Sequence, residues 1–236
     1  MTVRSFALLL ALSSAVSVAA ADPASTSEVL APPLPGPVVI MVSGASGLDP
    51  YRGMAQALQQ RGYYVDLIDG REVLTRDSDG RAVLTRHIAQ ARGAASALPG
   101  KVAVVGYSQG GGGALLHAST LRDDVAAVVA FYPAISWSPS TTWLAQRVAV
   151  PTLVLAGEQD RYNGCCLIED MRALASAAQR LGAPLTLVSY PEAGHGFNLQ
   201  LGAYRSADAD DAWSRLLQVL DNALPAPSPA TTAGPR

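Results

Sequence analysis

One serine of this chain lies in a setting that suits covalent catalysis. Ser108 is the central residue of Gly-Tyr-Ser-Gln-Gly at positions 106–110, between an apolar stretch and an expected helix. A serine nucleophile needs a sharp turn that exposes its hydroxyl, and flanking glycines avoid side-chain clashes there. The motif, with a strand before it and a helix after it, predicts a nucleophile for acyl transfer at Ser108. A plain glycine-rich turn is the alternative.

A serine hydroxyl also needs a base that removes its proton, and the base needs a third group that holds its tautomer. The chain has three histidines. His195, in Gly-His-Gly-Phe after the last apolar stretch, is the predicted base. His117 lies about 13 Å from Ser108 along the intervening helix, at about 1.5 Å per residue, which is too far to accept its proton. His87 lies in the middle of an expected helix among polar neighbours, and we interpret it as a surface histidine.

The segments that must position these residues alternate between strand and helix. Short, nearly all apolar stretches predict strands buried on both faces. They are residues 38–42, 63–68, 102–107, 125–131, 152–156 and 185–190. Helices are expected at residues 51–61, 81–97, 110–120, 168–181 and 207–220. This order predicts an α/β fold with a doubly wound, mainly parallel sheet of about six strands, helices on both faces and a ligand site at the carboxyl ends of the strands.

Four consecutive glycines, residues 110–113, open the helix after Ser108. Each costs a helix about 1 kcal/mol relative to alanine, so the run predicts a close approach of helix, sheet and substrate at this point. A phosphate-binding loop is excluded because no Gly-Lys-Ser/Thr sequence follows.

Four segments together resemble the dienelactone hydrolase-like branch of the α/β-hydrolases. They are Val-Ser-Gly-Ala-Ser-Gly at 42–47, the serine pentapeptide at 106–110, Gly-Glu-Gln-Asp at 157–160 and Gly-His-Gly-Phe at 194–197. The resemblance covers roughly residues 36–220 and implies the α/β-hydrolase fold. It places the acid at Asp160, which gives the chain order serine, acid, histidine of this fold. Glu158 is the alternative acid, and Glu192 is a weaker one.

The same resemblance implies that the backbone N–H groups of Ala45 and Gln109 stabilise the oxyanion of the substrate. Two positions depart from the family pattern. Ser43 stands where many relatives have the histidine of His-Gly, which puts the hydrogen bonds that support this loop in question. Ser108 stands where dienelactone hydrolases proper have cysteine, so the lactone substrate does not carry over.

Adjacent Cys165 and Cys166 are the only cysteines of the chain. Neighbouring Cα atoms lie about 3.8 Å apart, below the roughly 4.4 Å at the lower end of ordinary disulfides, so this geometry favours two thiols over a bridge. A bridge would stiffen the loop that carries Asp160, and mild reduction is then expected to lower activity. Scattered histidines and adjacent cysteines do not give the ligand spacing of a metal site. No metal and no cofactor are predicted.

The N-terminus has the order of a secretory signal peptide: Arg4, an apolar run over residues 6–18, and small residues with Ala19 and Ala21 before the expected cut. The apolar run is too short to span a bilayer, for which about 20 residues are needed. We predict a signal peptide at 1–21, an extended lead-in at 22–36, one α/β domain at 37–224 and a disordered tail at 225–236. Export to the periplasm or the medium follows from the leader.

The sequence thus predicts an exported serine hydrolase that cleaves small or polymeric carboxylic esters through an acyl-enzyme. The formal net charge of −2 gives no reason to expect nucleic acid or an anionic membrane as a partner, and the oligomeric state stays open. No long insertion separates residues 131 and 151, so no large lid is expected over the site. Tyr132, Trp137 and Trp143 in that stretch are candidates for lining it, with ordinary packing under a loop as the alternative.

Other functions share these residues. The serine pentapeptide is also similar to that of cutinases, which makes a polyester substrate an alternative. A thioesterase or a peptidase would use the same three groups, because acyl transfer does not fix the leaving group. A binding module on a hydrolase scaffold would usually lack one of them.

Overall fold

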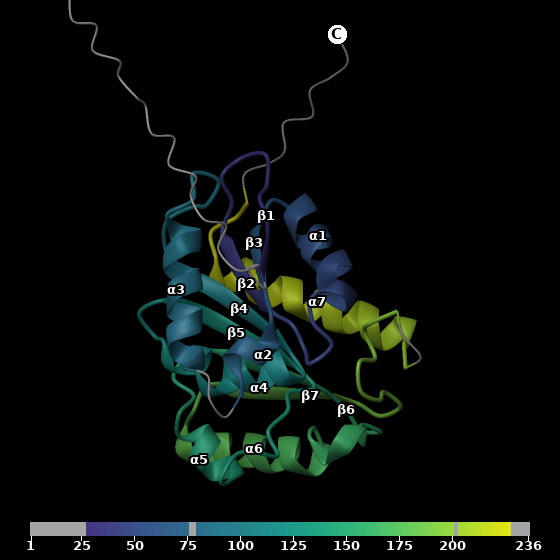
Figure 1. Cartoon of the computed structure of the whole chain (residues 1–236). Helices are drawn as coiled ribbons and strands as arrows, with labels where there is room; N and C mark the ends of the chain where they lie inside the picture. The colour runs from purple at the N-terminus through teal and green to yellow at the C-terminus, as the bar shows by residue number, and fades with distance from the viewer. Residues whose placement is uncertain (1–26, 76–78, 201–202, 228–236) are drawn as a thin grey trace, which may run out of the picture.

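The computed structural model describes residues 27–75, 79–200 and 203–227. A seven-stranded sheet forms the centre of this part of the chain (Figure 1). The strands are β1 (Ser27–Leu30), β2 (Val38–Val42), β3 (Tyr64–Ile68), β4 (Val102–Tyr107), β5 (Val125–Phe131), β6 (Thr152–Gly157) and β7 (Leu185–Tyr190). Their order is β1-β3-β2-β4-β5-β6-β7, and only β1 pairs with its neighbour in the antiparallel sense. The predicted α/β-hydrolase architecture is confirmed.

Seven α-helices connect or flank the strands in the described part of the chain. They are α1 (Arg52–Gln60), α2 (Gly70–Val73), α3 (Gly80–Arg92), α4 (Gln109–Leu116), α5 (Thr141–Ala145), α6 (Ile168–Leu181) and α7 (Ser206–Ala223). Short 3₁₀ turns lie at Asp49–Tyr51, Ala118–Thr120 and Tyr162–Gly164. The sequence does not predict α2 and α5, because four or five residues are too few to show a helical repeat of apolar positions.

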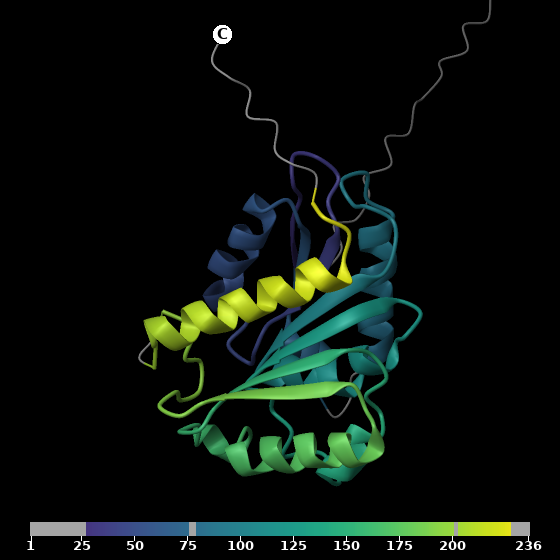
Figure 2. The same ribbon diagram turned by 180° about the vertical axis from the view of Figure 1, so that it is seen from behind.

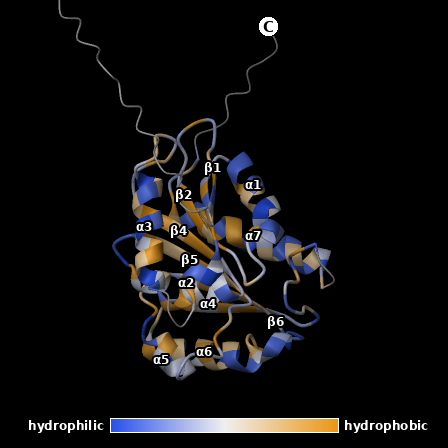
Figure 3. Cartoon of the chain, viewed as in Figure 1, coloured by the Kyte–Doolittle hydropathy of each residue, from blue (hydrophilic) through white to orange (hydrophobic). Residues whose placement is uncertain are grey.

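The helices cover both faces of the sheet. Figure 1 shows α3 and α4 in front of the strands, and Figure 2, from the opposite side, shows α7 in front of them. The alternation of side chains along β2 explains the two layers. Met41 points into a core that includes Leu58 of α1 and Leu216 of α7, whereas Ile40 packs with Leu84 of α3. Figure 3 accordingly shows the central strands in the hydrophobic colour.

Strand β1 lies in the segment that the sequence analysis interprets as an extended lead-in. It pairs antiparallel with β3, with Ser27 opposite Ile68 and Leu30 opposite Val65. The strand is only partly buried, so it lacks the continuous apolar run by which the inner strands are recognised. It is the reason that the sheet has seven strands and not about six.

Two other expectations fall at the ends of the chain. The signal peptide at 1–21 lies outside the described residues, as does most of the predicted tail, residues 228–236. None of the helices in the described ranges combines the length and the apolar character that a membrane span requires.

The interpretation of His87 as a surface histidine is wrong. Its Nδ1 lies 2.8 Å from Oδ2 of Asp66 on β3, and the two residues are only 7% and 3% exposed. The other oxygen, Oδ1 of Asp66, is buried without a partner in the described part of the chain. Polar neighbours in sequence do not reveal that α3 packs this histidine against a strand.

We expect His87→Leu to lower the free energy of unfolding by about 3 kcal/mol, because the Asp66 carboxylate would lose its partner inside the core. Replacing both residues, as in Asp66→Val/His87→Leu, removes the buried charge and is expected to cost less than the single change. Urea denaturation of the three proteins measures this. A single variant as stable as the parent would contradict the expectation.

Candidate active site

Three side chains from three loops form one hydrogen-bonded chain. Nε2 of His195 lies 3.0 Å from Oγ of Ser108, and Nδ1 of His195 lies 2.7 Å from Oδ2 of Asp160. A carboxylate beside Nδ1 favours the tautomer in which Nδ1 carries the proton and donates it, which leaves Nε2 free to accept from the serine hydroxyl. The structure thus brings together the three residues that the sequence analysis selects as nucleophile, base and acid.

Ser108 occupies an unusual backbone conformation between β4 and α4. Its φ is 51° and its ψ is −114°, a combination that side-chain-bearing residues rarely adopt. The turn is held on both sides, since the Ser108 N–H donates to the Phe131 carbonyl and the Ser108 carbonyl accepts from Gly112 and Ala134. Such strain persists only where surrounding contacts fix it, and it is common at functional sites.

The glycines around Ser108 are required by close backbone contacts, as the glycine run predicts. A Cβ at position 106 would lie 2.4 Å from the carbonyl oxygen of Gly110, and a Cβ at position 110 would lie 2.3 Å from that of Ser43. The Gly110 N–H donates to this same Ser43 oxygen at 3.1 Å. No side chain fits between the start of α4 and the loop after β2.

Asp160 and His195 come from neighbouring loops that are tied together. The Gln159 N–H donates to the Ala193 carbonyl, and a Cβ on Gly157 would lie only 2.3 Å from that oxygen. Asp160 itself is fully buried, and its Oδ1 accepts from the Tyr162 N–H at 3.0 Å. Both oxygens of the carboxylate are therefore used, and the orientation of the imidazole is fixed.

The two alternative acids lie elsewhere. Oε1 of Glu158 accepts from the Ser189 hydroxyl and pairs with Arg172, each at 2.7 Å. These bonds, first the one from Ser189 and then the one from Arg172, hold the pKa of the Glu158 carboxyl below its usual value. Glu192 is exposed. Asp160 is the carboxylate that meets His195.

Backbone amides are available where an oxyanion would form. Ala45 and Gln109 both line a cleft that contains Ser108. Within the described part of the chain neither N–H donates to another protein group, and Gln109 is the first residue of α4, where such amides are free. Their direction relative to a bound substrate stays a prediction.

The hydrogen bonds that support the loop after β2 are present although Ser43 replaces histidine. Ser43 Oγ accepts from the Gly70 N–H at 3.1 Å and donates to the Gly44 carbonyl at 3.2 Å. On the other side of the loop the Tyr51 hydroxyl packs against Gly44, where a Cβ would lie 2.4 Å from it, and burial raises the pKa of this phenol. The loop that carries Ala45 is therefore held from two sides.

Two tyrosines enclose the imidazole of His195. The ring of Tyr132 meets it edge-on with centroids 4.7 Å apart, and the ring of Tyr162 stacks on it at 4.5 Å with an angle of 11° between the planes. Tyr132 is fully buried, and its hydroxyl donates to Asn198. Sequence reasoning names Tyr132 but misses Tyr162. The only signal for Tyr162 is its place two residues after Asp160.

Two clefts meet at Ser108. The Trp137 cleft, of about 640 Å³, is lined mainly by apolar groups: Ala45, Leu74, Leu116, Ala134, Trp137, Tyr162 and Cys165, with Thr75, Gln109 and Asn163. The Tyr51 cleft, of about 300 Å³, is lined by Ala45, Ser46, Tyr51, Tyr132, Tyr162, His195, Gly196, Leu199 and Ala203. Trp143 lines neither and instead packs edge-on against Trp137.

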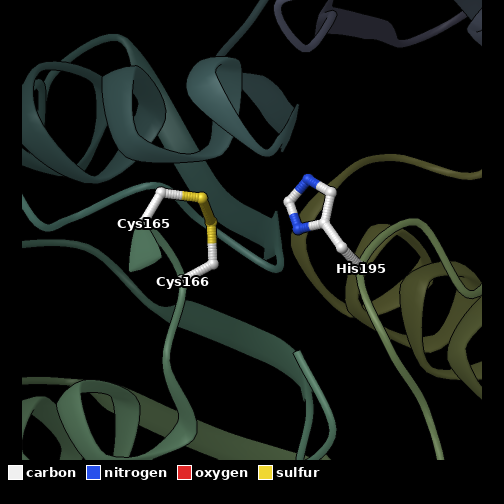
Figure 4. A group of neighbouring side chains, drawn as sticks. All are labelled: Cys165, Cys166 and His195. Atoms are coloured by element: carbon white, nitrogen blue, oxygen red, sulfur yellow. A yellow bond between two sulfur atoms is a disulfide. The ribbon is translucent and has the colours of Figure 1, made fainter. Parts of the chain in front are cut away.

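The preference for two thiols at Cys165 and Cys166 is wrong, because the residues form a disulfide between neighbours, with Cα atoms 3.8 Å apart. Backbone hydrogen bonds hold Cys165 in place. The Cys165 N–H donates to the Tyr162 carbonyl, and the Cys165 carbonyl accepts from Ile135 and Ser136. The sulfurs also lie beside the ring of His195, which no spacing in the sequence indicates (Figure 4).

Comparison with known proteins identifies relatives of this chain. The model of the dienelactone hydrolase family matches residues 26–224. A protein of Escherichia coli K12, provisionally named carboxymethylenebutenolidase, is 30% identical over 125 residues, which are 50% of this chain and 45% of that protein. The chain thus spans about half the length of the curated relatives that it matches.

Solved structures share the fold. A provisionally assigned dienelactone hydrolase from Klebsiella pneumoniae gives a TM-score of 0.67 at 23% identity, covering 79% of this chain and 87% of the other. An esterase from Thermogutta terrifontis with bound propionate gives 0.64 at 17% identity, covering 83% and 88%.

The backbone of Ser108 can be tested by two substitutions that both remove the hydroxyl. We expect Ser108→Gly to be more stable than Ser108→Ala by about 1 kcal/mol, because glycine relieves a positive φ that alanine keeps. Thermal and urea unfolding of the two variants measure this difference. Alanine at least as stable as glycine would show that the turn is not strained.

Proposed function

Because the chain belongs to the dienelactone hydrolase family, we propose that it is a serine hydrolase that cleaves carboxylic esters, with Ser108 as nucleophile, His195 as base and Asp160 as the group that orients His195. The single observation that carries this proposal is the hydrogen-bonded chain from Ser108 through His195 to the buried Asp160. It joins the serine hydroxyl to a base in the tautomer that can accept its proton.

The reaction takes place in two halves. Oγ of Ser108 attacks the acyl carbon of the ester while its proton passes to Nε2 of His195. The N–H groups of Ala45 and Gln109 donate to the oxyanion of the tetrahedral intermediate. His195 then protonates the departing alcohol, and the acyl group stays on Ser108. Water, deprotonated by His195, releases the acid in the second half.

Asp160 and the tyrosines keep His195 ready for both proton transfers. The carboxylate stabilises the imidazolium that forms when the serine loses its proton. The faces of Tyr132 and Tyr162 confine the ring, and the negative π-face of Tyr162 adds a favourable contact with its charged form. No step needs a cofactor, since the chain supplies nucleophile, base and oxyanion donors.

The lining of the two clefts favours neutral, apolar esters. Among the described residues that line them, none is Asp, Glu, Lys or Arg. A charged group on the substrate would lose water there without gaining a counterion, which is unfavourable. Aliphatic and aromatic groups in the Trp137 cleft would instead bury apolar surface.

A polyester is the second candidate substrate. Trp137 and Tyr162, which both line the Trp137 cleft, are 37% and 52% exposed. Together with clefts that meet at Ser108, they offer a surface for a polymer strand. Thioesters and peptides stay as further alternatives for the same three residues. We also propose that the protein is exported, on the strength of the leader at 1–21.

Hydrolysis of p-nitrophenyl esters from acetate to decanoate tests the activity. We expect turnover by the parent and a loss of kcat of about a thousandfold or more in Ser108→Ala, because removal of the nucleophile leaves only binding and the oxyanion donors. The profile over chain length measures the size of the acyl pocket. If neither folded protein hydrolyses any ester, polyester films included, the proposal is wrong, and thioesters and peptides become the substrates to assay.

Matched esters test the preference for neutral substrates. We expect kcat/KM for p-nitrophenyl pentanoate to exceed that for the mono-p-nitrophenyl ester of glutaric acid by about tenfold or more, because only the second carries a carboxylate into the cleft. The two acyl chains are equal in length, so the comparison isolates the charge. Equal values, or a preference for the anion, would contradict the inferred substrate class.

A further inference from the structure

The disulfide between Cys165 and Cys166 is part of the wall of the active site. Cys165 lines the Trp137 cleft, and Cys166 is 1% exposed behind it. A nitrogen of the His195 ring and the two sulfurs all lie within 4.8 Å of one another. Figure 4 shows the imidazole facing the disulfide from the opposite loop. The mechanism proposed above does not use the sulfurs.

We propose that reduction of this disulfide converts the wall into a binding site for one thiophilic divalent cation, such as Zn²⁺ or Cd²⁺, with Cys165, Cys166 and His195 as ligands. Thiolate and imidazole groups are the ligands that such ions prefer. The residues provide two thiolates and one neutral imidazole, so that the charge of the ion is balanced inside a partly buried site.

The conversion needs an external two-electron reductant, a dithiol or a phosphine. The S–S bond takes up two electrons and two protons, and Cys165 and Cys166 become thiols. Binding of the cation then forms two metal–sulfur bonds and releases the two thiol protons to water. Disulfides that are accessible to the attacking group are those that reduce readily, and Cys165 lies on an open cleft.

The three ligand atoms need only small movements to meet an ion. Around a tetrahedral zinc ion, with Zn–S about 2.3 Å and Zn–N about 2.1 Å, ligand atoms are about 3.5–3.8 Å apart. In the oxidised chain the sulfurs are bonded to each other, and the nitrogen is within 4.8 Å of both. Opening of the disulfide lets the sulfurs move apart, and loss of one hydrogen bond of His195 lets the imidazole turn toward the ion.

Metal binding and catalysis exclude each other at this site. Both ring nitrogens of His195 are engaged, one with Asp160 and the other with Ser108. Whichever nitrogen binds the cation, one of these two bonds is lost. A neutral imidazole that binds the cation through one nitrogen carries its proton on the other, so the reduced, metal-bound protein would have no base for Ser108. This consequence rests on the proposed esterase function, whereas the metal site itself does not.

Titration of the whole chain with Cd²⁺ tests the site directly. The protein is reduced with tris(2-carboxyethyl)phosphine, since dithiothreitol would itself bind the ion, and Cd²⁺ is followed by calorimetry and by the ultraviolet absorbance of the cadmium–thiolate bonds. We expect one Cd²⁺ per reduced chain and none per oxidised chain. Equal binding before and after reduction, or no binding after reduction, would overturn the proposal.

Variants assign the ligands. Cys165→Ala/Cys166→Ala is expected to lose the thiolate absorbance, and His195→Ala to bind Cd²⁺ about tenfold more weakly or worse. His117→Ala is the matched histidine control and should bind as the parent does, with circular dichroism confirming the fold of each variant. Unchanged affinity in His195→Ala would refute the role of the histidine as a ligand.

Ester hydrolysis provides the second measurement. Cd²⁺ should abolish the activity that the reduced chain retains, and a chelator should restore it, while the oxidised chain stays insensitive. Hydrolysis that persists at saturating Cd²⁺ would refute mutual exclusion. If no form of the chain hydrolyses esters, only the proposed function fails, because Cd²⁺ binding is measured independently.

Discussion

At the turn from β4 to α4 the backbone packs directly against the backbone of the loop after β2, and the site depends on this contact. Gly110 touches the carbonyl of Ser43 at a distance that leaves no space for a methyl group. The contact keeps Ser108 at its positive φ, places the Gln109 amide at the free end of α4 and fixes the loop that carries Ala45. The glycines weaken α4 as a helix, but Ala114 and Leu115 beyond them pack into two apolar clusters on the same face of the sheet.

The sequence predicts the inner framework well because burial on both faces leaves a strong pattern. The apolar stretches locate β2 to β7 to within one residue. The order of the elements puts Ser108, Asp160 and His195 at the carboxyl ends of the strands. The family resemblance that the motifs indicate is confirmed by the match over residues 26–224. Strand β1, only partly buried at the edge, carries no such pattern and is missed.

The remaining features depend on contacts between distant segments, which a local pattern cannot show. The sequence indicates a surface position for His87, but α3 packs against β3 and buries it beside Asp66. Tyr162 becomes a wall of the site because the turn after Asp160 folds back over His195. The disulfide is disfavoured by average spacing, yet it forms in a loop whose hydrogen bonds hold Cys165 in place.

The partners in the hydrogen-bonded chain are far apart in sequence. Ser108 and His195 are separated by 87 positions, and Asp160 and His195 by 35. Bringing residues of this separation together requires closing long loops, which carries an entropy cost. A chain that lacked only β7 in its sheet would hold the serine without its base. If turnover needs all three residues, its recovery after dilution from denaturant reports that the loops after β4, β6 and β7 have come together.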